Sequence, residues 1–268
     1  EGDRDGWLTS VFTKRPLAQF DLLLISNAYA LELVNLPYLL TRAGIALSAS
    51  ERRQAGFKPL IVLGGSNSLA AQSVTFSDKD ALVDAIHFGE GETLVSALVE
   101  TLKTRPGAER RTALEEHAAS VDGLVVFTST KAPSRVTKAV YRSMDRYPIK
   151  CANDPPLFDS DEASTIRLQI SAGCPSFCTF CFEGWERKPY REVPYRKLVE
   201  DALYLKQTTG ADSVELTSFN FNTHSDIVAL IVELQRYFKQ VDFMSQRADI
   251  LAIMPALASF EAAAGKRV

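Results

Sequence analysis

The sequence predicts an α/β protein: a Rossmann-like, doubly wound parallel-sheet domain followed by a partial (β/α) barrel. Short apolar segments, each the length of a buried strand, alternate with longer segments of helical periodicity. A Pro-rich stretch interrupts this alternation near the middle of the chain. The 268 residues are 46% hydrophobic and 24% charged, which indicates a folded globular chain with room for two modest domains.

The first predicted domain covers residues 1–104. Apolar segments indicate strands at 20–26, 60–65 and 85–88, and periodic segments indicate helices at 32–43 and 93–103. The last helix follows the sequence GEGET, whose Gly residues permit a tight turn and whose Glu residues favour a helix N-terminus. This alternation predicts a doubly wound parallel sheet.

Residues 105–164 differ in composition and are predicted to be a connecting segment and linker. A short helical piece at 113–119 and a short strand at 123–128 precede four prolines: Pro133, Pro148, Pro155 and Pro156.

The last predicted domain, residues 165–268, returns to strand-helix repeats. The strands are expected at 165–171, 213–219 and 241–244, and the helices at 195–209, 227–238 and 250–264. Because three such units do not close a barrel, we expect the first half of one, from a piece of a longer protein. The third strand would then present an unpaired edge, so aggregation or dimerisation is expected.

The charge balance excludes a general nucleic-acid surface. Thirty Lys and Arg residues against 33 Asp and Glu residues leave a net charge of -3, without the basic excess typical of nucleic-acid binding. No apolar stretch approaches the roughly 20 residues that a membrane helix needs, and no signal peptide opens the chain. We therefore expect a cytoplasmic protein without a membrane partner; nucleic acid is not indicated as a partner, although a local basic patch stays open.

Three clustered cysteines are the strongest functional signal. Cys174, Cys178 and Cys181 form a C-x3-C-x2-C pattern in the sequence SAGCPSFCTFCFEG. Three thiolates on one short loop can converge on one metal centre. On a four-iron cluster they would leave one iron open to a substrate or cofactor, whereas ferredoxin clusters use four Cys ligands.

Two alternatives to an iron-sulfur cluster stay open for this loop. A zinc site would need a fourth ligand, for which Cys151, His224 and His117 are the candidates. The other alternative is a set of three free thiols without a metal. Zinc sites usually combine well-separated pairs of ligands, and this loop has one close pair, so the spacing favours the cluster.

The cysteine pattern resembles the signature of radical S-adenosylmethionine (SAM) enzymes, including the aromatic Phe180 just before the last Cys. The stretch CTFCFEGWERKPYREVP resembles a subgroup that also carries an N-terminal cobalamin-binding-like domain. Upstream, LIVLGGSNSLA and VDAIHFGEGETLVSALVE resemble the closing strands of that domain, and SQRADILA near the C-terminus also fits. The resemblance covers about residues 20–268.

The resemblance implies an enzyme in which the three Cys residues hold a 4Fe-4S cluster. In this family the open iron binds the amino and carboxylate groups of SAM, and the aromatic lies near the adenine. An electron from the cluster cleaves SAM to methionine and a 5'-deoxyadenosyl radical, which abstracts a hydrogen atom from the substrate. A small-molecule or other unidentified substrate and a reductant such as flavodoxin or ferredoxin are the implied partners. Methyl transfer, rearrangement and C-S bond formation all stay open.

Further SAM contacts are expected at the carboxyl ends of the second and third barrel strands. Thr217 and Ser218 lie at the carboxyl end of the second strand, where the family often has a Gly-Gly-Glu stretch that is missing here, and Ser245 and Arg247 follow the third. Arg247 could bind a carboxylate of SAM or form a surface ion pair with Asp249 or Glu261. The run from Glu183 to Tyr190 could shield the cluster from water.

Cobalamin is a further candidate cofactor, with Gly64, Gly65 and Ser66 as the contact surface that the resemblance suggests. The D-x-H-x-x-G motif of protein-ligated cobalamin is missing, and His87 is expected to be buried at the end of a strand. Two other functions remain: a non-catalytic cobalamin- or metal-binding module, and a structural zinc protein.

Overall fold

The structure is a computed structural model in two compact units, Glu1–Tyr141 and Arg142–Val268, each described by itself below. It describes residues 8–10, 12–56, 58–67, 74–75, 80–107, 109–127, 135–148 and 165–263. In these parts of the chain, no helix is long and apolar enough to span a membrane.

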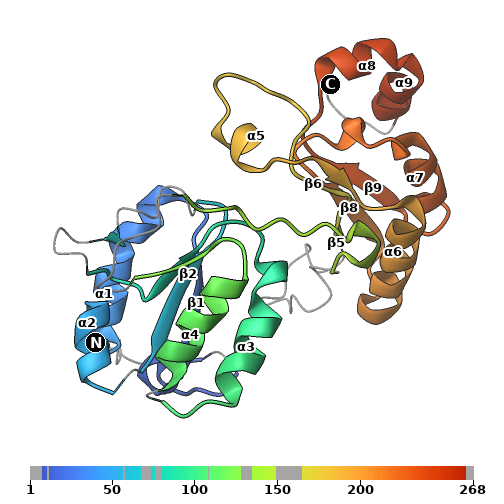
Figure 1. Cartoon of the computed structure of the whole chain (residues 1–268). Helices are drawn as coiled ribbons and strands as arrows, with labels where there is room; N and C mark the ends of the chain where they lie inside the picture. The colour runs from blue at the N-terminus through green and yellow to red at the C-terminus, as the bar shows by residue number, and fades with distance from the viewer. Residues whose placement is uncertain are drawn as a thin grey trace. The chain divides into compact units, whose positions relative to one another are not determined.

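The first unit is built on one four-stranded sheet (Figure 1). Its strands, in spatial order, are β1 (Leu22–Ser26), β2 (Leu60–Gly64), β3 (Ala85–His87) and β4 (Leu124–Val126). The first three strands are parallel, and β4 joins β3 antiparallel. Because β2 is buried, its sequence is apolar throughout rather than alternating, and the buried strand β3 is apolar up to His87.

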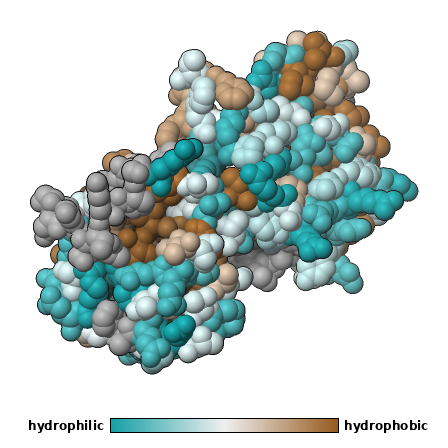
Figure 2. Space-filling view, in the orientation of Figure 1, coloured by the Kyte–Doolittle hydropathy of each residue, from teal (hydrophilic) through white to brown (hydrophobic). Residues whose placement is uncertain are grey.

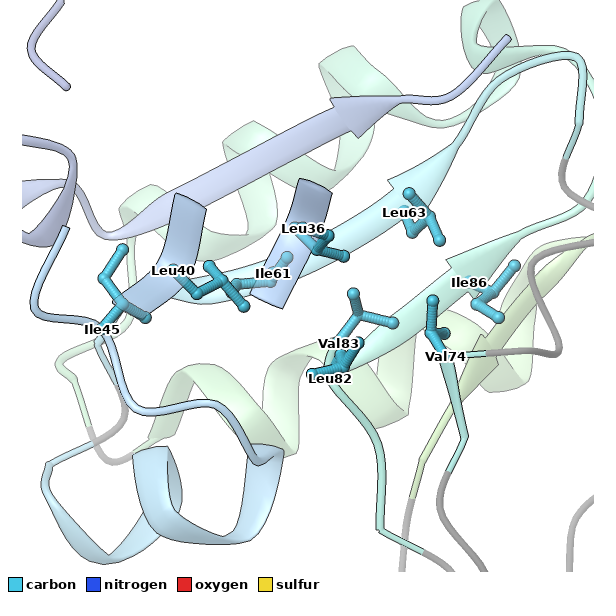
Figure 3. Packing of buried hydrophobic residues seen from close by; sticks show 9 residues of the cluster. All are labelled: Leu36, Leu40, Ile45, Ile61, Leu63, Val74, Leu82, Val83 and Ile86. Carbon is cyan, nitrogen blue, oxygen red and sulfur yellow. The ribbon is translucent and has the colours of Figure 1, made fainter. Parts of the chain in front are cut away.

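Helices cover both faces of this sheet. α1 (Asn35–Arg42) and α2 (Ala49–Gln54) follow β1, whereas α3 (Val95–Lys103) and α4 (Glu109–Ser120) follow β3 and lie on the opposite side in Figure 1. Along β2, Ile61 and Leu63 pack in the cluster that contains Leu36 and Leu40 of α1, as Figure 3 shows. Leu60 and Val62 pack instead with α3 and α4. Parallel strands covered on two faces confirm the predicted α/β class.

Part of the predicted connecting segment belongs to the first unit. α4 packs against α3, and β4 pairs with β3 from His87↔Leu124 to Ala85↔Val126. The reason is burial, because Ala113, Leu114 and Leu124 complete the apolar cluster on that face of the sheet. Residues 149–164 of the predicted linker lie outside the described part of the chain.

A buried ionic cluster fixes the start of β3. Both carboxylate oxygens of Asp84, which is 1% exposed, are paired with Arg residues at 3.1 Å: Oδ2 with Arg52 of α2 and Oδ1 with Arg111 of α4. Oδ2 also accepts the backbone N–H of Ile61 at 2.9 Å. One carboxylate therefore joins a helix from each face of the sheet to the central strands.

The second unit contains a three-stranded parallel sheet in the order β5 (Thr165–Gln169), β8 (Ser213–Thr217) and β9 (Gln240–Phe243). Its longer helices are α6 (Tyr195–Thr209), α7 (Ile227–Leu234), α8 (Ala248–Ile253) and α9 (Pro255–Ala263). Some apolar side chains of α7 and α8, including Val232 and Ile253, stay exposed, in keeping with the brown areas at this end of the molecule in Figure 2. The described strands form an open sheet and no closed barrel.

Two elements of the second unit differ from the prediction. The expected helix 250–264 is divided into α8 and α9, because Pro255 cannot continue a helix and begins a new one. The expected strand 165–171 ends at Gln169. Ser171 and Ala172 form a separate strand, β6, which pairs antiparallel with β7 (Arg191–Glu192).

Short 3-10 helices complete the described structure. They are η2 (Leu17–Gln19), η3 (Ala30–Val34), η5 (Gly91–Thr93), η6 (Met144–Arg146) and η8 (Phe221–Thr223). The predicted helix 32–43 consists of η3 and α1, with Pro37 in the first turn of α1, where its missing N–H is tolerated.

Candidate iron-sulfur site

The three cysteines lie on an excursion between β6 and β7 that also contains the short helix α5 (Phe182–Glu186), drawn in yellow in Figure 1. Gly173 starts this excursion with φ +77°, in the left-handed region that favours glycine. A Cβ atom at Gly173 would lie 2.3 Å from the carbonyl oxygen of Arg187 and 2.4 Å from that of Pro189. The start and the end of the loop therefore cross in direct backbone contact.

Two of the three sulfur atoms accept hydrogen bonds. The Asn220 side-chain amide donates to Cys174 Sγ at 3.3 Å, and the Gly184 N–H donates to Cys181 Sγ at 3.3 Å. Cys174 is buried, whereas Cys178 and Cys181 are partly exposed. Sulfur atoms that accept N–H donors suit thiolates better than thiols, and such bonds tune iron-sulfur clusters.

Two cations hold the segment from Cys174 to Ser176. Lys188 Nζ donates to the carbonyl oxygens of Cys174 and Ser176, both at 2.6 Å. The Arg247 guanidinium donates to Ser176 Oγ from the end of β9. The cysteine loop is thus tied both to its own returning strand and to the neighbouring parallel sheet.

Arg247 is itself rigidly placed. Its backbone N–H and C=O both bond to the side chain of Asn222, at 2.9 Å each, and Asn222 is buried. Its guanidinium binds Asp249 through two hydrogen bonds of 2.9 and 2.5 Å. These bonds raise the pKa of Arg247, with a smaller contribution from Cys178 and Cys174, and lower the pKa of Asp249. The predicted ion pair with Asp249 is confirmed, and the SAM contact of Arg247 stays a prediction.

The strand-end residues named from the sequence lie at one edge of the second sheet. Thr217 ends β8, and its carbonyl oxygen accepts the N–H of Ile170. Ser218 follows with a buried Oγ atom that has no hydrogen-bond partner. Ser245 is exposed, and its carbonyl oxygen accepts the N–H of Phe221 at 3.0 Å. Contact of these residues with SAM stays a prediction.

Gln246, which is partly buried, and Glu261 form a polar pair beside these residues. The Gln246 amide donates to one carboxylate oxygen of Glu261 at 3.0 Å, and Glu261 is fully buried in α9. The second Glu261 oxygen and the Gln246 carbonyl oxygen have no hydrogen-bond partner. The predicted alternative of an Arg247 ion pair with Glu261 is wrong, because Gln246 binds that carboxylate.

The aromatic residues of the loop are largely exposed. Phe180, the predicted adenine contact, is 90% exposed, and Trp185 is half-exposed. Trp185 packs edge-to-face on Phe177 with ring centroids 5.2 Å apart, and its indole N–H donates to the Cys178 carbonyl oxygen. These rings leave Phe180 uncovered as a surface onto which a flat group can stack.

The polar members of the run from Glu183 to Tyr190 are used within the loop. Arg187 pairs with Glu183 and Glu186. Tyr190 donates to Glu192 at 3.0 Å, and burial, together with the Glu192 charge, raises the pKa of Tyr190 to about 12. Their shielding of a cluster from water stays a prediction.

Of the alternative zinc ligands, His224 lies in the same unit as the thiols and is engaged elsewhere. Both ring nitrogens of His224 are occupied, one by the Val193 carbonyl oxygen at 3.0 Å and one by the Asp226 N–H at 3.1 Å. His117 lies in the other unit, on α4, and Cys151 lies outside the described residues. Among the residues that the structure describes, no three His, Cys, Asp or Glu side chains are grouped closely enough to hold a metal ion. The three cysteines share one loop, but their convergence on a cluster is not shown.

In the predicted cobalamin surface, the backbone conformation and its close neighbours explain the glycine at position 65. Gly65 has φ +98°, and a Cβ there would lie 2.4 Å from the carbonyl oxygen of Asn27. Gly65 is thus required where the ends of β1 and β2 approach. Gly64 ends β2, Ser66 is half-buried, and cobalamin contact by these residues stays a prediction.

His87 lies at the end of β3, buried to 3% exposure, as predicted from the sequence. Nε2 contacts the Glu90 carbonyl oxygen at 3.2 Å, and Nδ1 has no hydrogen-bond partner. Burial lowers the pKa of His87.

A mainly parallel first sheet and a parallel second sheet, with a three-cysteine loop after the first strand of the second, define an α/β protein with a candidate iron-sulfur site. Residues 3–126 match the family model described as radical SAM proteins, N-terminal. This part of the chain is therefore similar to the N-terminal domain of radical SAM proteins.

Two known proteins show partial similarity. The tRNA-2-methylthio-N(6)-dimethylallyladenosine synthase of Fusobacterium nucleatum subsp. nucleatum is 36% identical over 73 residues, which are 26% of this chain and 16% of that protein. The structure of the radical S-adenosylmethionine methyltransferase TsrM from Kitasatospora setae, with tryptophan substrate and a SAM analog (aza-SAM) bound, aligns with a TM-score of 0.44 and 16% identity. That alignment covers 80% of this chain and 40% of the TsrM chain. The chain thus covers less than two thirds of either relative.

Proposed function

We propose that the chain is part of a radical SAM enzyme and binds a 4Fe-4S cluster through Cys174, Cys178 and Cys181. One observation carries this proposal: three thiols lie on one loop after the first strand of a parallel sheet, and two of their sulfurs accept N–H donors. The family match of residues 3–126 supports it independently, because that match lies outside the cysteine loop.

The donor set fits a three-Cys cluster. Sulfur ligands select zinc and iron-sulfur centres, and three of them on a four-iron cluster leave one iron free. When bound together with SAM, such a cluster supplies the electron that cleaves SAM to methionine and a 5'-deoxyadenosyl radical. Asn220 and the Gly184 N–H then act as donors to two of the ligand sulfurs and disperse their negative charge.

The neighbouring residues can orient SAM. Phe180 offers an exposed ring for adenine, and Ser218 offers a hydroxyl whose hydrogen-bonding capacity is unused in the structure. The Arg247 guanidinium adds a positive charge beside the thiols, and Asp249 holds it in place. The proposed reductant is a flavodoxin- or ferredoxin-type electron donor, as in the family, and the proposed substrate is an unidentified small molecule.

Iron binding tests the ligand assignment. After anaerobic reconstitution, we expect four irons per chain in the wild type and a brown absorption near 400 nm, as for any 4Fe-4S protein. Cys178→Ala should lose most of this iron. Cys151→Ala removes a thiol outside the loop and should retain it. Equal iron in both variants, or a colourless wild type that binds one zinc ion, would overturn the proposal.

A further inference from the structure

The cysteine loop is folded around a lysine ammonium group. Lys188 Nζ lies 2.6 Å from two carbonyl oxygens of the loop, those of Cys174 and Ser176, and 3.8 Å from the centroid of the Phe177 ring. Three of the four residues after Gly173 thus contact this one cation, two through their carbonyl oxygens and one through its ring face.

This arrangement is well suited to fixing a loop. An ammonium group has three donors and binds carbonyl oxygens without needing a planar partner. Lys188 is half-buried, so these contacts are less weakened by water than those of a surface lysine. A ring over the cation adds a cation-π attraction, which is stronger when the charge is partly desolvated.

The contacts of Lys188 continue to the second cysteine. The ring of Phe177 supports Trp185 by an edge-to-face contact, and the Trp185 indole N–H donates to the Cys178 carbonyl oxygen at 2.9 Å. One side chain after α5 therefore constrains the backbone at Cys174 directly and at Cys178 through two rings. Cys181 is held separately, at the N-terminus of α5.

We propose that Lys188 is a positioning residue that holds the cysteine loop in its curved, ligand-presenting form before any cluster is bound. This inference rests on the proposed function, because the cluster is what the loop would bind. The positioning of the loop itself is a property of the metal-free protein. Lys188 acts through the loop carbonyls and touches none of the sulfur atoms in the contacts above.

The reactivity of the thiols tests this inference in the metal-free protein. Cys174 is 6% exposed, so alkylation requires local opening of the loop, whereas Cys178 and Cys181 are partly exposed and serve as internal references. We expect Lys188→Met to raise the ratio of Cys174 to Cys178 alkylation by iodoacetamide about tenfold, since two charge-assisted hydrogen bonds are lost. Mass spectrometry of the labelled peptides gives this ratio.

Two further variants make the result specific. Lys239→Met removes an exposed lysine of the same unit whose ammonium group pairs with Asp212, and should leave the ratio unchanged. Lys188→Arg keeps the charge but replaces the ammonium by a planar fork, and should give an intermediate ratio. If Lys188→Met unfolds the unit, circular dichroism will show the loss of structure. The alkylation ratio of Lys188→Arg then decides whether Lys188 positions the loop.

The outcomes separate this inference from the proposed function. A Cys174 to Cys178 ratio that is the same in the wild type and both Lys188 variants overturns the positioning role, even if the wild type binds a cluster. A raised ratio in a protein whose wild type takes up no iron supports the positioning role and overturns the proposed function.

Discussion

Gly173 shows how strongly one residue constrains the candidate site. Its φ of +77° resembles that of Gly210, at +72°, but the surroundings differ. A Cβ at Gly173 would meet two backbone oxygens, whereas nothing lies within 4 Å of a Cβ at Gly210. Comparing an alanine substitution at each glycine therefore separates the stability lost to a left-handed backbone from the stability lost to a steric clash.

We predict that Gly173→Ala lowers the free energy of unfolding by about 3 kcal/mol or more, because backbone strain and a clash add. Gly210→Ala should cost only about 1 kcal/mol, the penalty of the left-handed conformation alone. Urea denaturation in a Trp7→Phe background, followed by Trp185 fluorescence, measures both. Equal costs would contradict the crossing of the loop ends at Gly173.

His87 gives a pH dependence to the first unit. Burial lowers its folded-state pKa below the ordinary value of 6.5, so the unfolded chain binds the proton more readily. Stability is therefore complete above pH 6.5 and falls as the pH drops from 6.5 toward the folded-state pKa.

We predict that the wild type loses more stability than His87→Asn between pH 7.5 and pH 5.5, by up to about 1.4 kcal/mol. Urea denaturation at the two pH values, followed by circular dichroism, measures the difference. The same loss in both proteins would show that the His87 ring is not held neutral by burial.

Among the elements, β3 depends on charge rather than on apolar packing alone. Asp84 faces Arg52 and Arg111, all three buried, so removing the carboxylate would leave the Arg52 guanidinium buried without its counterion and Arg111 with Glu115 alone. We predict that Asp84→Ala costs about 3–5 kcal/mol in urea denaturation. Glu100→Gln breaks an exposed pair with Lys103 and should cost under about 0.5 kcal/mol. A cost near 1 kcal/mol for Asp84→Ala would contradict the cluster.

Local sequence signals account for the elements that were predicted well. Helix α6 begins after Pro194 and ends at Gly210, as its sequence indicates, because both residues enforce a boundary locally. The hairpin β6-β7 was not predicted, since strands of two residues have no measurable periodicity. The Asp84 cluster was also missed, because its members come from three distant segments of the chain.

In the candidate site, too, local features could be predicted from the sequence and contacts between distant segments could not. The spacing of Cys174, Cys178 and Cys181 could be identified from the sequence, because all three lie on one loop. The contacts that donors and cations make with the loop could not be identified, although Arg247 was expected near the site. Asn220 follows β8 and Arg247 follows β9, and only the parallel pairing of these strands brings them close to the loop. Lys188 follows the motif, but its two carbonyl contacts depend on the turn at Gly173.

At the scale of the whole molecule, the open second sheet predicts self-association. Within the described strands, β5 and β9 each have one neighbour in the sheet, and Val232 and Ile253 are exposed on nearby helices. Unpaired strand edges and exposed apolar groups favour association. Sedimentation velocity should show the sedimentation coefficient rising with protein concentration. A monodisperse, stable monomer over the same range would contradict the open edge.

The central claim is that the three-cysteine loop holds a cluster with an iron open to SAM. The most direct test is electron paramagnetic resonance of the reconstituted, reduced protein, recorded with and without SAM. We predict a reduced 4Fe-4S signal in the wild type that changes shape when SAM is added, and no such signal in Cys178→Ala. A cluster signal that is identical with and without SAM would contradict an open iron at this site.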